Sequence, residues 1–352
     1  MSGKKWCILT LGLLLGALAF IAGLTALIDP YFHYHAPLPG LAYELSDERQ
    51  RYINDGISKH FEYDAMLTGT SMMENSRSST FDELFGVNSV KVPYEGSSLK
   101  ETDQNLRRAI EANGELELVF RSLDYFIIIR EKDEQLYPED LYPDYLYDDN
   151  LINDVSYLFN KTVLLENTLP TIGRTLRGER MSSFDEYSLM DKTLFGMKLP
   201  EKGFGPPAES KGGASEELLL QIEGNIRQNV LETVLANPEI EFYYVISPYS
   251  VLYWNRLREN GKVDEHLDAE QKAAELLVGV ENVHIFSFYD CPEIIGALDH
   301  YMDECHYDEE ILDIIFRYMA KGEHRLTEDN YVEAFSRARE LFKYGDLAAL
   351  VQ

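Results

Sequence analysis

The stretch DAMLTGTSMMENS (residues 64–76) sets the pattern from which the fold of this 352-residue chain is predicted. Its apolar run has the length of a buried strand, and Gly69, Thr70 and Ser71 close that run before a group of helix-forming residues. Ser71 has two interpretations. It is the N-cap of a helix, which accepts hydrogen bonds from free backbone N–H groups, or it is a nucleophile held on a tight turn. A nucleophile needs a base, an orienting acid and an oxyanion site elsewhere in the chain.

Strand and helix patterns alternate on both sides of this turn. After the first strand, further strands are predicted in VNSVKVPY (87–94), ELVFRSLDYFIII (117–129), EFYYVISPYS (241–250) and VENVHIFSF (280–288). Helices are predicted at 47–60, 98–114, 216–238, 269–278 and 309–322. Alternation of this kind predicts an α/β fold, with a five-stranded parallel sheet covered by helices.

The alternation stops between residues 130 and 215. This part holds an acidic, tyrosine-rich segment (131–150), a helical pattern (157–169) and a Gly/Pro-rich connector (198–213). A structureless loop of that length is uncommon in a compact domain, so we expect an insertion with partial structure of its own. The predicted organisation is a cytoplasmic end (1–5), an anchor (6–28), a juxtamembrane segment (29–60), a catalytic domain (61–325) and a C-terminal helix (326–352).

The segment Trp6–Ile28 is apolar and without charge over 23 residues. At about 1.5 Å per residue it is about 34 Å long, enough to cross a hydrocarbon core of about 30 Å. Lys4 and Lys5 precede it, so the positive-inside rule predicts a single-pass membrane protein with a cytoplasmic N-terminus and an extracytoplasmic main domain. Ala17-Leu18-Ala19 has the form of a signal-peptidase site, but cleavage there leaves a further apolar stretch on the mature chain, which favours an uncleaved anchor.

Charge and cysteine content exclude several classes of protein. The chain has 32 basic and 61 acidic residues, and two of the basic ones precede the span, so the outer part carries 30 minus 61, or −31. Nucleic acid is disfavoured as a partner because phosphate binding needs a basic face. Cys291 and Cys305 form either one disulfide or two buried thiols. No organised set of three or four ligands predicts a metal site, and no cofactor is expected.

Polar residues follow the predicted strands at the edge where an open parallel sheet binds its ligands. Ser71 follows the first strand, Gly96 the second and Asp124 the third, and Asp303-Glu304-Cys305-His306 lies beyond the fifth. A histidine three residues after an aspartate can direct one ring nitrogen to a serine on another loop and the other nitrogen to the aspartate. The sequence therefore predicts Ser71 as nucleophile, His306 as base and Asp303 as orienting acid.

The order of these motifs resembles that of the SGNH/GDSL hydrolase superfamily. GTS after the first strand, the glycine of PYEGSS after the second and D-x-x-H before a late helix match its pattern between Asp64 and about Gly322. The resemblance implies a flavodoxin-like three-layer α/β/α sandwich, a Ser71 nucleophile, an oxyanion donor at the Gly96 N–H, and Asp303 and His306 as the last block.

One block of the superfamily is absent. The sequence reads FRSLDYF (120–126) where the G-x-N-D block stands, so Asn75, Ser97 or Asp124 is the candidate to complete the oxyanion or substrate site. The missing block, the anchor and the insertion are similar to those of membrane-anchored relatives that move acyl groups onto cell-surface polymers. Among them are the D-alanine transfer protein of lipoteichoic acid and the acetyltransferase-like proteins of exopolysaccharide pathways.

These features predict an esterase or acyltransferase that acts on acyl esters of a glycan or a teichoic-acid-type polymer through a Ser-His-Asp triad. The alternative is a non-catalytic surface protein of the same fold. Such a protein binds glycan or a membrane-embedded partner acyltransferase.

Overall fold

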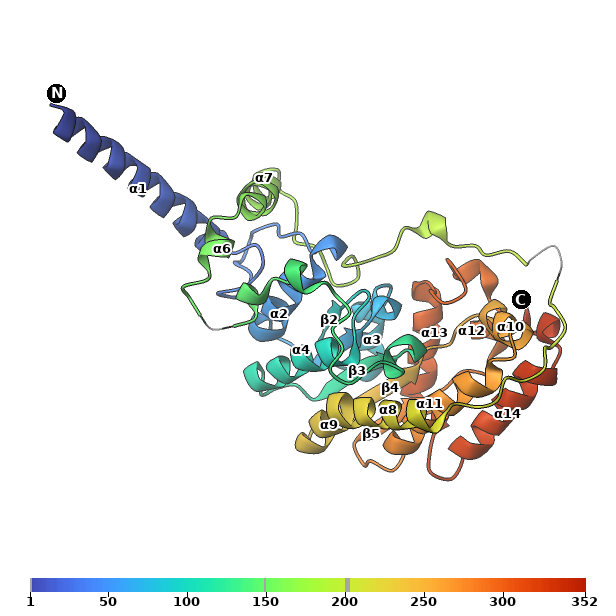
Figure 1. Ribbon diagram of the computed structural model, residues 1–352. Coiled ribbons are helices and arrows are strands. Elements are labelled where there is room, and N and C mark those ends of the chain that lie inside the picture. The colour runs from blue at the N-terminus through green and yellow to red at the C-terminus, as the bar shows by residue number, and fades with distance from the viewer. Residues whose placement is uncertain (1, 149, 200–202) are drawn as a thin grey trace.

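The centre of the molecule is a six-stranded mixed sheet in the order β2-β1-β3-β4-β5-β6 (Figure 1). The structure is a computed structural model that describes residues 2–148, 150–199 and 203–352. The first five strands pair in parallel and β6 pairs with β5 in the antiparallel sense. The strands are β1 (Ala65–Gly69), β2 (Ser89–Pro93), β3 (Leu118–Leu123), β4 (Glu241–Ile246), β5 (Val283–Phe286) and β6 (Arg325–Leu326).

The α/β class and the five predicted strands are confirmed, but the prediction of a five-stranded, all-parallel sheet is wrong. The sixth strand has only two residues, in which Leu326 pairs with Ile285 and Arg325 with Phe286. Two residues are too few to show a period-2 pattern, and the predicted boundary fell between them, with Arg325 at the end of the catalytic domain and Leu326 at the start of the C-terminal helix. That helix, α14 (Tyr331–Tyr344), begins five residues after β6 ends.

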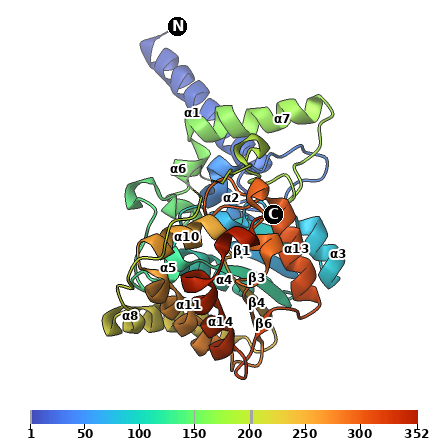
Figure 2. The same ribbon diagram turned by 90° about the vertical axis from the view of Figure 1, so that its right-hand side faces the viewer.

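Helices cover both faces of the sheet (Figure 2). Phe120 and Arg121 are neighbours on β3 and therefore point to opposite faces. The Phe120 ring packs against Phe316 of α13. Arg121 is buried on the other face, where it donates to Leu99 O at 2.7 Å and to Asn229 O at 2.9 Å. The first face is covered by α3 (Ser78–Phe85) and α13 (Glu309–Ala320), and the second by α4 (Leu99–Ala112), α8 (Glu216–Ile226), η7 (Arg227–Leu231) and α9 (Glu232–Ala236).

Other helices complete the body. The predicted helix at 47–60 is present as η1 (Asp47–Arg49) followed by α2 (Gln50–His60), which packs on α4 and β2. The helix predicted at 269–278 is the second half of α11 (Val263–Leu277). Sequence analysis did not predict α10 (Val251–Glu259), and the short helices α5 (Tyr125–Ile128) and α12 (Pro292–Ile295) follow β3 and β5.

The predicted insertion at 130–215 is built mainly from short helical turns and extended segments. Its helical elements in the described residues are η3 (Glu139–Leu141), η4 (Asp144–Leu146), α6 (Val155–Leu158), η5 (Val163–Thr168), α7 (Leu169–Leu176) and η6 (Lys192–Leu194). Part of the Gly/Pro-rich connector, residues 200–202, lies outside the described residues. The elements α6, η5 and α7 lie beside the N-terminal helix rather than on the sheet (Figures 1 and 2).

The N-terminal helix α1 (Gly3–Ile28) projects from the body (Figure 1). It is long and apolar enough to cross a membrane. Residues 2–20 are exposed, and buried side chains begin only at Thr25, in the last turn.

Candidate active site

Three adjacent strands bring the predicted site residues to one edge of the sheet. Because β1 lies between β2 and β3, the segments that carry Ser71, Gly96 and Asp124 leave the sheet side by side. A pocket of about 520 Å³ lies at this edge. Six of the seven predicted residues line it, namely Ser71, Gly96, Ser97, Asp124, Asp303 and His306, whereas Asn75 does not.

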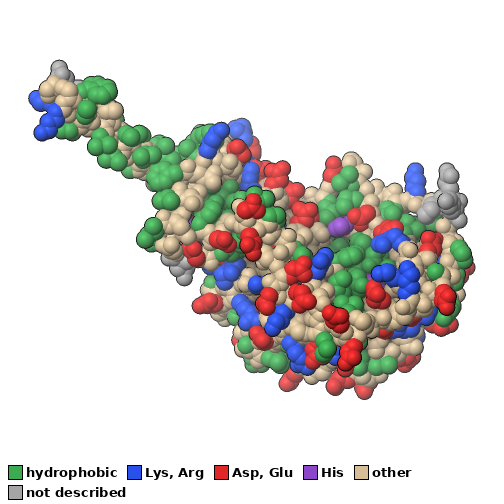
Figure 3. Space-filling view, in the orientation of Figure 1, with side chains coloured by type: hydrophobic (Ala, Val, Ile, Leu, Met, Phe, Trp, Pro, Cys, Tyr) green, Lys and Arg blue, Asp and Glu red, His purple; other side chains and the backbone are tan. Residues whose placement is uncertain are grey.

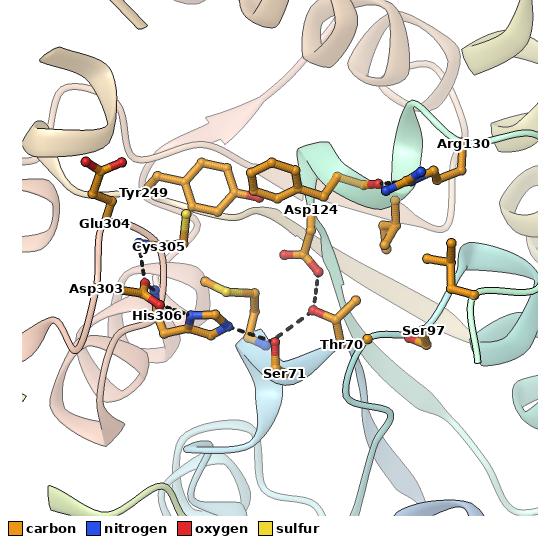
Figure 4. Close-up of a pocket in the computed structure, with 15 residues that line it drawn as sticks. Thr70, Ser71, Ser97, Asp124, Arg130, Tyr249, Asp303, Glu304, Cys305 and His306 are labelled. Carbon is orange, nitrogen blue, oxygen red and sulfur yellow. Dashed lines mark hydrogen bonds and ion pairs between the residues drawn. The ribbon is translucent and has the colours of Figure 1, made fainter. Parts of the chain in front are cut away.

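Two successive hydrogen bonds on the pocket wall join Ser71 to His306 and His306 to Asp303 (Figure 4). Ser71 Oγ lies 2.9 Å from His306 Nε2, although the two residues are 235 positions apart in the chain. His306 Nδ1 lies 2.7 Å from Asp303 Oδ2. The Nδ1–H tautomer of His306 donates to Asp303 and leaves Nε2 free to accept the Ser71 proton.

Thr70, not Ser71, caps the turn that follows β1. The Thr70 hydroxyl accepts from the Met72 N–H at 3.3 Å, which satisfies a free donor of the helical turn. Gly69 lets this turn approach β3 closely, because it has a φ of +144° and a Cβ there would lie 2.4 Å from Ser122 Oγ. With the capping done by Thr70, the Ser71 hydroxyl is directed to His306 instead.

The loop that carries His306 is held on two sides. Tyr301 and Tyr307 form a β-bridge that closes the loop, and the Ser250 hydroxyl donates to Glu304 O at 2.9 Å. From the turn that carries Ser71, Asn75 Nδ2 donates to Tyr307 O at 2.8 Å. These bonds fix the loop that carries His306 against the turn that carries Ser71.

The Asp303 carboxylate organises this loop as well as the imidazole. Its Oδ1 accepts from the backbone N–H groups of Cys305 at 2.7 Å and of His306 at 2.8 Å. Partial burial raises the pKa of Asp303, but the hydrogen bonds from the His306 ring and the two N–H groups outweigh it and hold the pKa at about 2. The hydrogen bond to this carboxylate in turn raises the pKa of His306 against the opposing effect of burial. An ionised Asp303 therefore stabilises the imidazolium that forms when His306 takes a proton.

Asp124 lines the pocket, and three hydroxyl groups are directed at its carboxylate. Thr70 Oγ1 donates to its Oδ2 at 2.5 Å and Ser122 Oγ at 3.1 Å, and Ser247 Oγ donates to Oδ1. Burial raises the pKa of Asp124, while these hydrogen bonds oppose the rise. Since all three hydroxyls donate, the carboxylate acts as an acceptor that orders the strand ends and not as an oxyanion donor.

Three other groups near Ser71 are candidates to donate to a developing oxyanion. Within the described part of the chain, the Ser71 and Gly96 N–H groups make no hydrogen bond to a protein acceptor. Gly96 has a φ of +61°, a conformation that glycine adopts without strain. Ser97 lines the pocket, and its buried hydroxyl has no hydrogen-bond partner among the described residues. A buried hydroxyl without a partner is costly, and a ligand atom in the pocket can satisfy it.

Asn75 is engaged elsewhere. Its side chain is 2% exposed, its Nδ2 donates to Tyr307 O, and its Oδ1 accepts from the Met190 N–H at 3.0 Å. The structure therefore does not bring this amide to the pocket with the other predicted residues. Its contacts join the turn that carries Ser71 to the loop that carries His306 and to the insertion.

Sequence reasoning missed the apolar side of the pocket. Phe126, Ile127 and Leu136 line it after β3, and Tyr249 does so after β4. The basic residue on the lining, Arg130, lies at the side away from His306 (Figure 4). The position of 247–250 directly after a parallel strand is a sequence signal that places Tyr249 at this edge. Leu136 belongs to the irregular insertion and gives no such signal.

A buried polar cluster supports the turn from below. The Lys91 ammonium donates to Glu74 O at 2.7 Å and to Ser76 O at 2.9 Å, and Gln50 donates to the Glu74 carboxylate. Burial lowers the pKa of Lys91 to about 7. Burial raises the pKa of Glu74 to about 7, against the hydrogen bond from Gln50. Glu74 is 6% exposed, so its contacts are with this buried cluster and not with solvent.

The cysteines, which all lie in the part of the chain that the structure describes, form no disulfide. Cys7, Cys291 and Cys305 are free thiols, and Cys305 lines the pocket. Among the described residues, no group of three or more His, Cys, Asp and Glu side chains is arranged to hold a metal ion.

Comparisons with known proteins give little beyond this geometry. Models of known protein families give no match, and curated proteins give none either. Among solved structures, the chain is similar to one described as "a putative platelet activating factor from Streptococcus pneumonia", with 14% identity, coverage of 78% of this chain and 89% of that chain, and a TM-score of 0.36. A likeness this distant carries no argument about activity, so the function has to be argued from the site itself.

Proposed function

We propose that the protein is an extracytoplasmic serine esterase or acyltransferase of the SGNH type, with the flavodoxin-like sandwich that this type implies. Its substrates are acyl esters of a cell-surface glycan or teichoic-acid-type polymer. The observation that carries the proposal is the line from Ser71 Oγ through His306 to Asp303, with spacings of 2.9 Å and 2.7 Å, beside a pocket.

The first half-reaction forms an acyl-enzyme. His306 Nε2 takes the Ser71 proton as Oγ attacks the ester carbonyl, and Asp303 stabilises the resulting imidazolium. The negative charge on the carbonyl oxygen is met by the Ser71 and Gly96 N–H groups and the Ser97 hydroxyl. Collapse of the tetrahedral intermediate breaks the ester C–O bond, and the imidazolium returns its proton to the leaving alcohol.

The second half-reaction repeats these steps with a new nucleophile. His306 deprotonates a water molecule or a polymer hydroxyl, which attacks the acyl carbon and releases Ser71. Water gives hydrolysis and a polymer hydroxyl gives transfer. We favour transfer because the chain resembles anchored acyl-transferring relatives and because its apolar helix suits a position at the cell surface.

The pocket suits an acyl ester. A volume of about 520 Å³ accommodates an acyl group together with part of the alcohol that carries it. Phe126, Ile127 and Tyr249 offer an apolar wall for the acyl chain. A membrane-embedded acyltransferase that supplies the acyl group is the partner we propose for the transfer reaction.

The proposal is tested by the pre-steady-state hydrolysis of p-nitrophenyl acetate by the full chain in detergent. We expect a burst of nitrophenolate equal to the enzyme concentration, which reports the acyl-enzyme. The burst disappears in Ser71→Ala and is slowed in His306→Ala. If the wild type shows no burst and no turnover above that of Ser71→Ala, the catalytic function is wrong and the glycan-binding alternative is favoured.

A further inference from the structure

Exposed hydrophobic side chains are concentrated in one part of the insertion. Outside α1, the described residues include sixteen exposed large hydrophobic side chains, and seven of them fall between residues 151 and 176. These seven define the basal surface: Leu151, Ile152, Val155, Phe159, Leu165, Leu169 and Leu176. Ile152 and Leu176 are 82% and 83% exposed, which is costly in water unless another apolar phase covers them.

The basal surface is continuous with the apolar helix α1. The elements α6 and η5 contact α1, and α7 runs beside its base (Figure 2). In the space-filling view, hydrophobic side chains cover α1 and continue onto the neighbouring part of the body, whereas acidic groups are frequent on the rest of that face (Figure 3). Lipid packed around α1 would therefore also lie next to the basal surface.

The C-terminal end of α1 is held against the body by buried hydrogen bonds, and not joined to it only by a flexible linker. Asp29, at the C-cap, accepts from the backbone N–H groups of His33, Tyr34 and His35 and from the Tyr157 hydroxyl at 2.7 Å. Asp29 and Tyr157 are each 0% exposed. This buried network holds the direction of α1 relative to α6, so the depth of the anchor in a membrane also sets the depth of the insertion.

That depth follows from the length of the helix. A hydrocarbon core of about 30 Å takes up about 20 residues of a helix. Counted from Trp6, the first residue after the two lysines, this stretch ends near Thr25, where the side chains of α1 become buried. The contact with α6 and η5 therefore lies at the outer boundary of the hydrocarbon core.

Charge in this segment does not oppose contact with lipid headgroups. Residues 150–180 contain four basic residues (Lys161, Arg174, Arg177 and Arg180) and three acidic ones, whereas the whole chain has a net charge of −29. This segment is therefore spared the repulsion that an anionic membrane surface exerts on the rest of the protein.

We propose that the basal surface is a membrane-contact surface, and that its partner is the outer leaflet of the bilayer that α1 crosses. Ile152, Leu176 and their neighbours lie in the interfacial layer beside the anchor, as the apolar face of an interfacial helix does. The protein then contacts the membrane through the basal surface as well as through α1. This double contact holds the pocket at a fixed distance from the membrane and in a fixed orientation.

Depth-dependent fluorescence quenching tests this proposal in the full chain reconstituted in phosphatidylcholine–phosphatidylglycerol vesicles. Cys7→Ser and Cys305→Ala remove the accessible thiols, and a bimane label is placed on Ile152→Cys or Leu176→Cys. Leu14→Cys in the span is the lipid-exposed control, and Leu235→Cys, 64% exposed on α9, is the aqueous control. All four positions are exposed, so the labels leave the core intact.

We expect labels at 152 and 176 to be quenched by headgroup-proximal doxyl lipid more strongly than the label at 14, which lies near the middle of the span, and to be protected from iodide. The label at 235 shows the reverse. Labels at 152 and 176 that behave like the one at 235, while 14 is quenched by lipid, overturn the membrane-contact surface. Absence of lipid quenching at 14 overturns it as well, because the anchor is then not inserted.

Discussion

The hydroxyl of Thr70 donates to Asp124 Oδ2 at 2.5 Å and accepts from the Met72 N–H at 3.3 Å. One side chain thus ties the turn that carries Ser71 to the end of the neighbouring strand β3. Because Thr70 does the capping, the Ser71 hydroxyl is left for His306, at 2.9 Å. The position of the proposed nucleophile depends on a residue that does not take part in the chemistry.

Two replacements of Thr70 test whether its hydroxyl positions the Ser71 turn or whether the side chain only fills space. Thr70→Val removes the acceptor for the Met72 N–H and the donor to Asp124, so we expect the free energy of unfolding to fall by about 1–3 kcal/mol. Displacement of the Ser71 turn lowers the burst rate by about 10- to 100-fold. Thr70→Ser keeps the hydroxyl and serves as the matched control, in which both quantities stay near wild type. Equal burst rates in the two variants would contradict the positioning role.

Ser97 tests the oxyanion site. Ser97 lines the pocket, and its buried hydroxyl has no partner among the described residues. The Ser89 hydroxyl is likewise buried without a described partner, but Ser89 does not line the pocket. Ser97→Ala lowers the rate of acylation by about 10²–10³-fold, the usual effect of losing one oxyanion donor. Ser89→Ala leaves the rate unchanged. Thermal unfolding of both variants stays close to wild type, because neither hydroxyl has a hydrogen-bond partner among the described residues. If Ser97→Ala is acylated at the wild-type rate, Ser97 is not part of the oxyanion site.

The pH dependence of acylation follows from the pair of His306 and Asp303. His306 must be neutral to accept the Ser71 proton, and its pKa lies above the usual 6.5, so the burst rate falls as the pH drops through that raised value. Asp303→Asn removes the group that raises this pKa. We expect the acid limb to move to lower pH and the plateau rate to fall by about 10²–10⁴-fold. A pH–rate profile of the burst measures both changes, and an acid limb at the wild-type position in Asp303→Asn would contradict the assignment.

Glu74 links stability to pH. Burial raises its folded pKa to about 7 from 4.5, so the folded state holds this proton more tightly than the unfolded state does. The stability that the protonated form contributes is fully present below about pH 4.5 and is lost as the pH rises through about 7. Glu74→Gln removes this loss. We expect denaturant unfolding to show that the free energy of unfolding of Glu74→Gln rises relative to that of wild type by up to about 3 kcal/mol between these pH values. A constant difference between the two proteins would rule out the raised pKa.

How much of this was predictable depends on the range of the interactions. The strands and main helices follow from local periodicity, so the sequence identified the five parallel strands and the edge where Ser71 and Asp124 emerge. The short strand β6 depends on pairing with β5, and a two-residue strand carries no pattern of its own. For this reason the sequence predicts no strand there and assigns Leu326 to the C-terminal helix.

Side-chain direction within the site was less accessible to sequence reasoning. Thr70 and Ser71 are both good capping residues, and only the positions of Asp124 and His306 decide which one caps. Asn75 was a candidate for the pocket, but its amide bonds to Tyr307 O, 232 residues away. Contacts of this range are set by how the loops pack, which one sequence does not specify.

The most direct test of the central claim is active-site labelling of the full chain with a fluorophosphonate, followed by peptide mapping. We predict one adduct on Ser71, its loss in Ser71→Ala, and a strong reduction of labelling in His306→Ala, because His306 activates the serine. Thr70→Ser is the control that labels as wild type. An adduct on another serine that persists in Ser71→Ala would contradict the account.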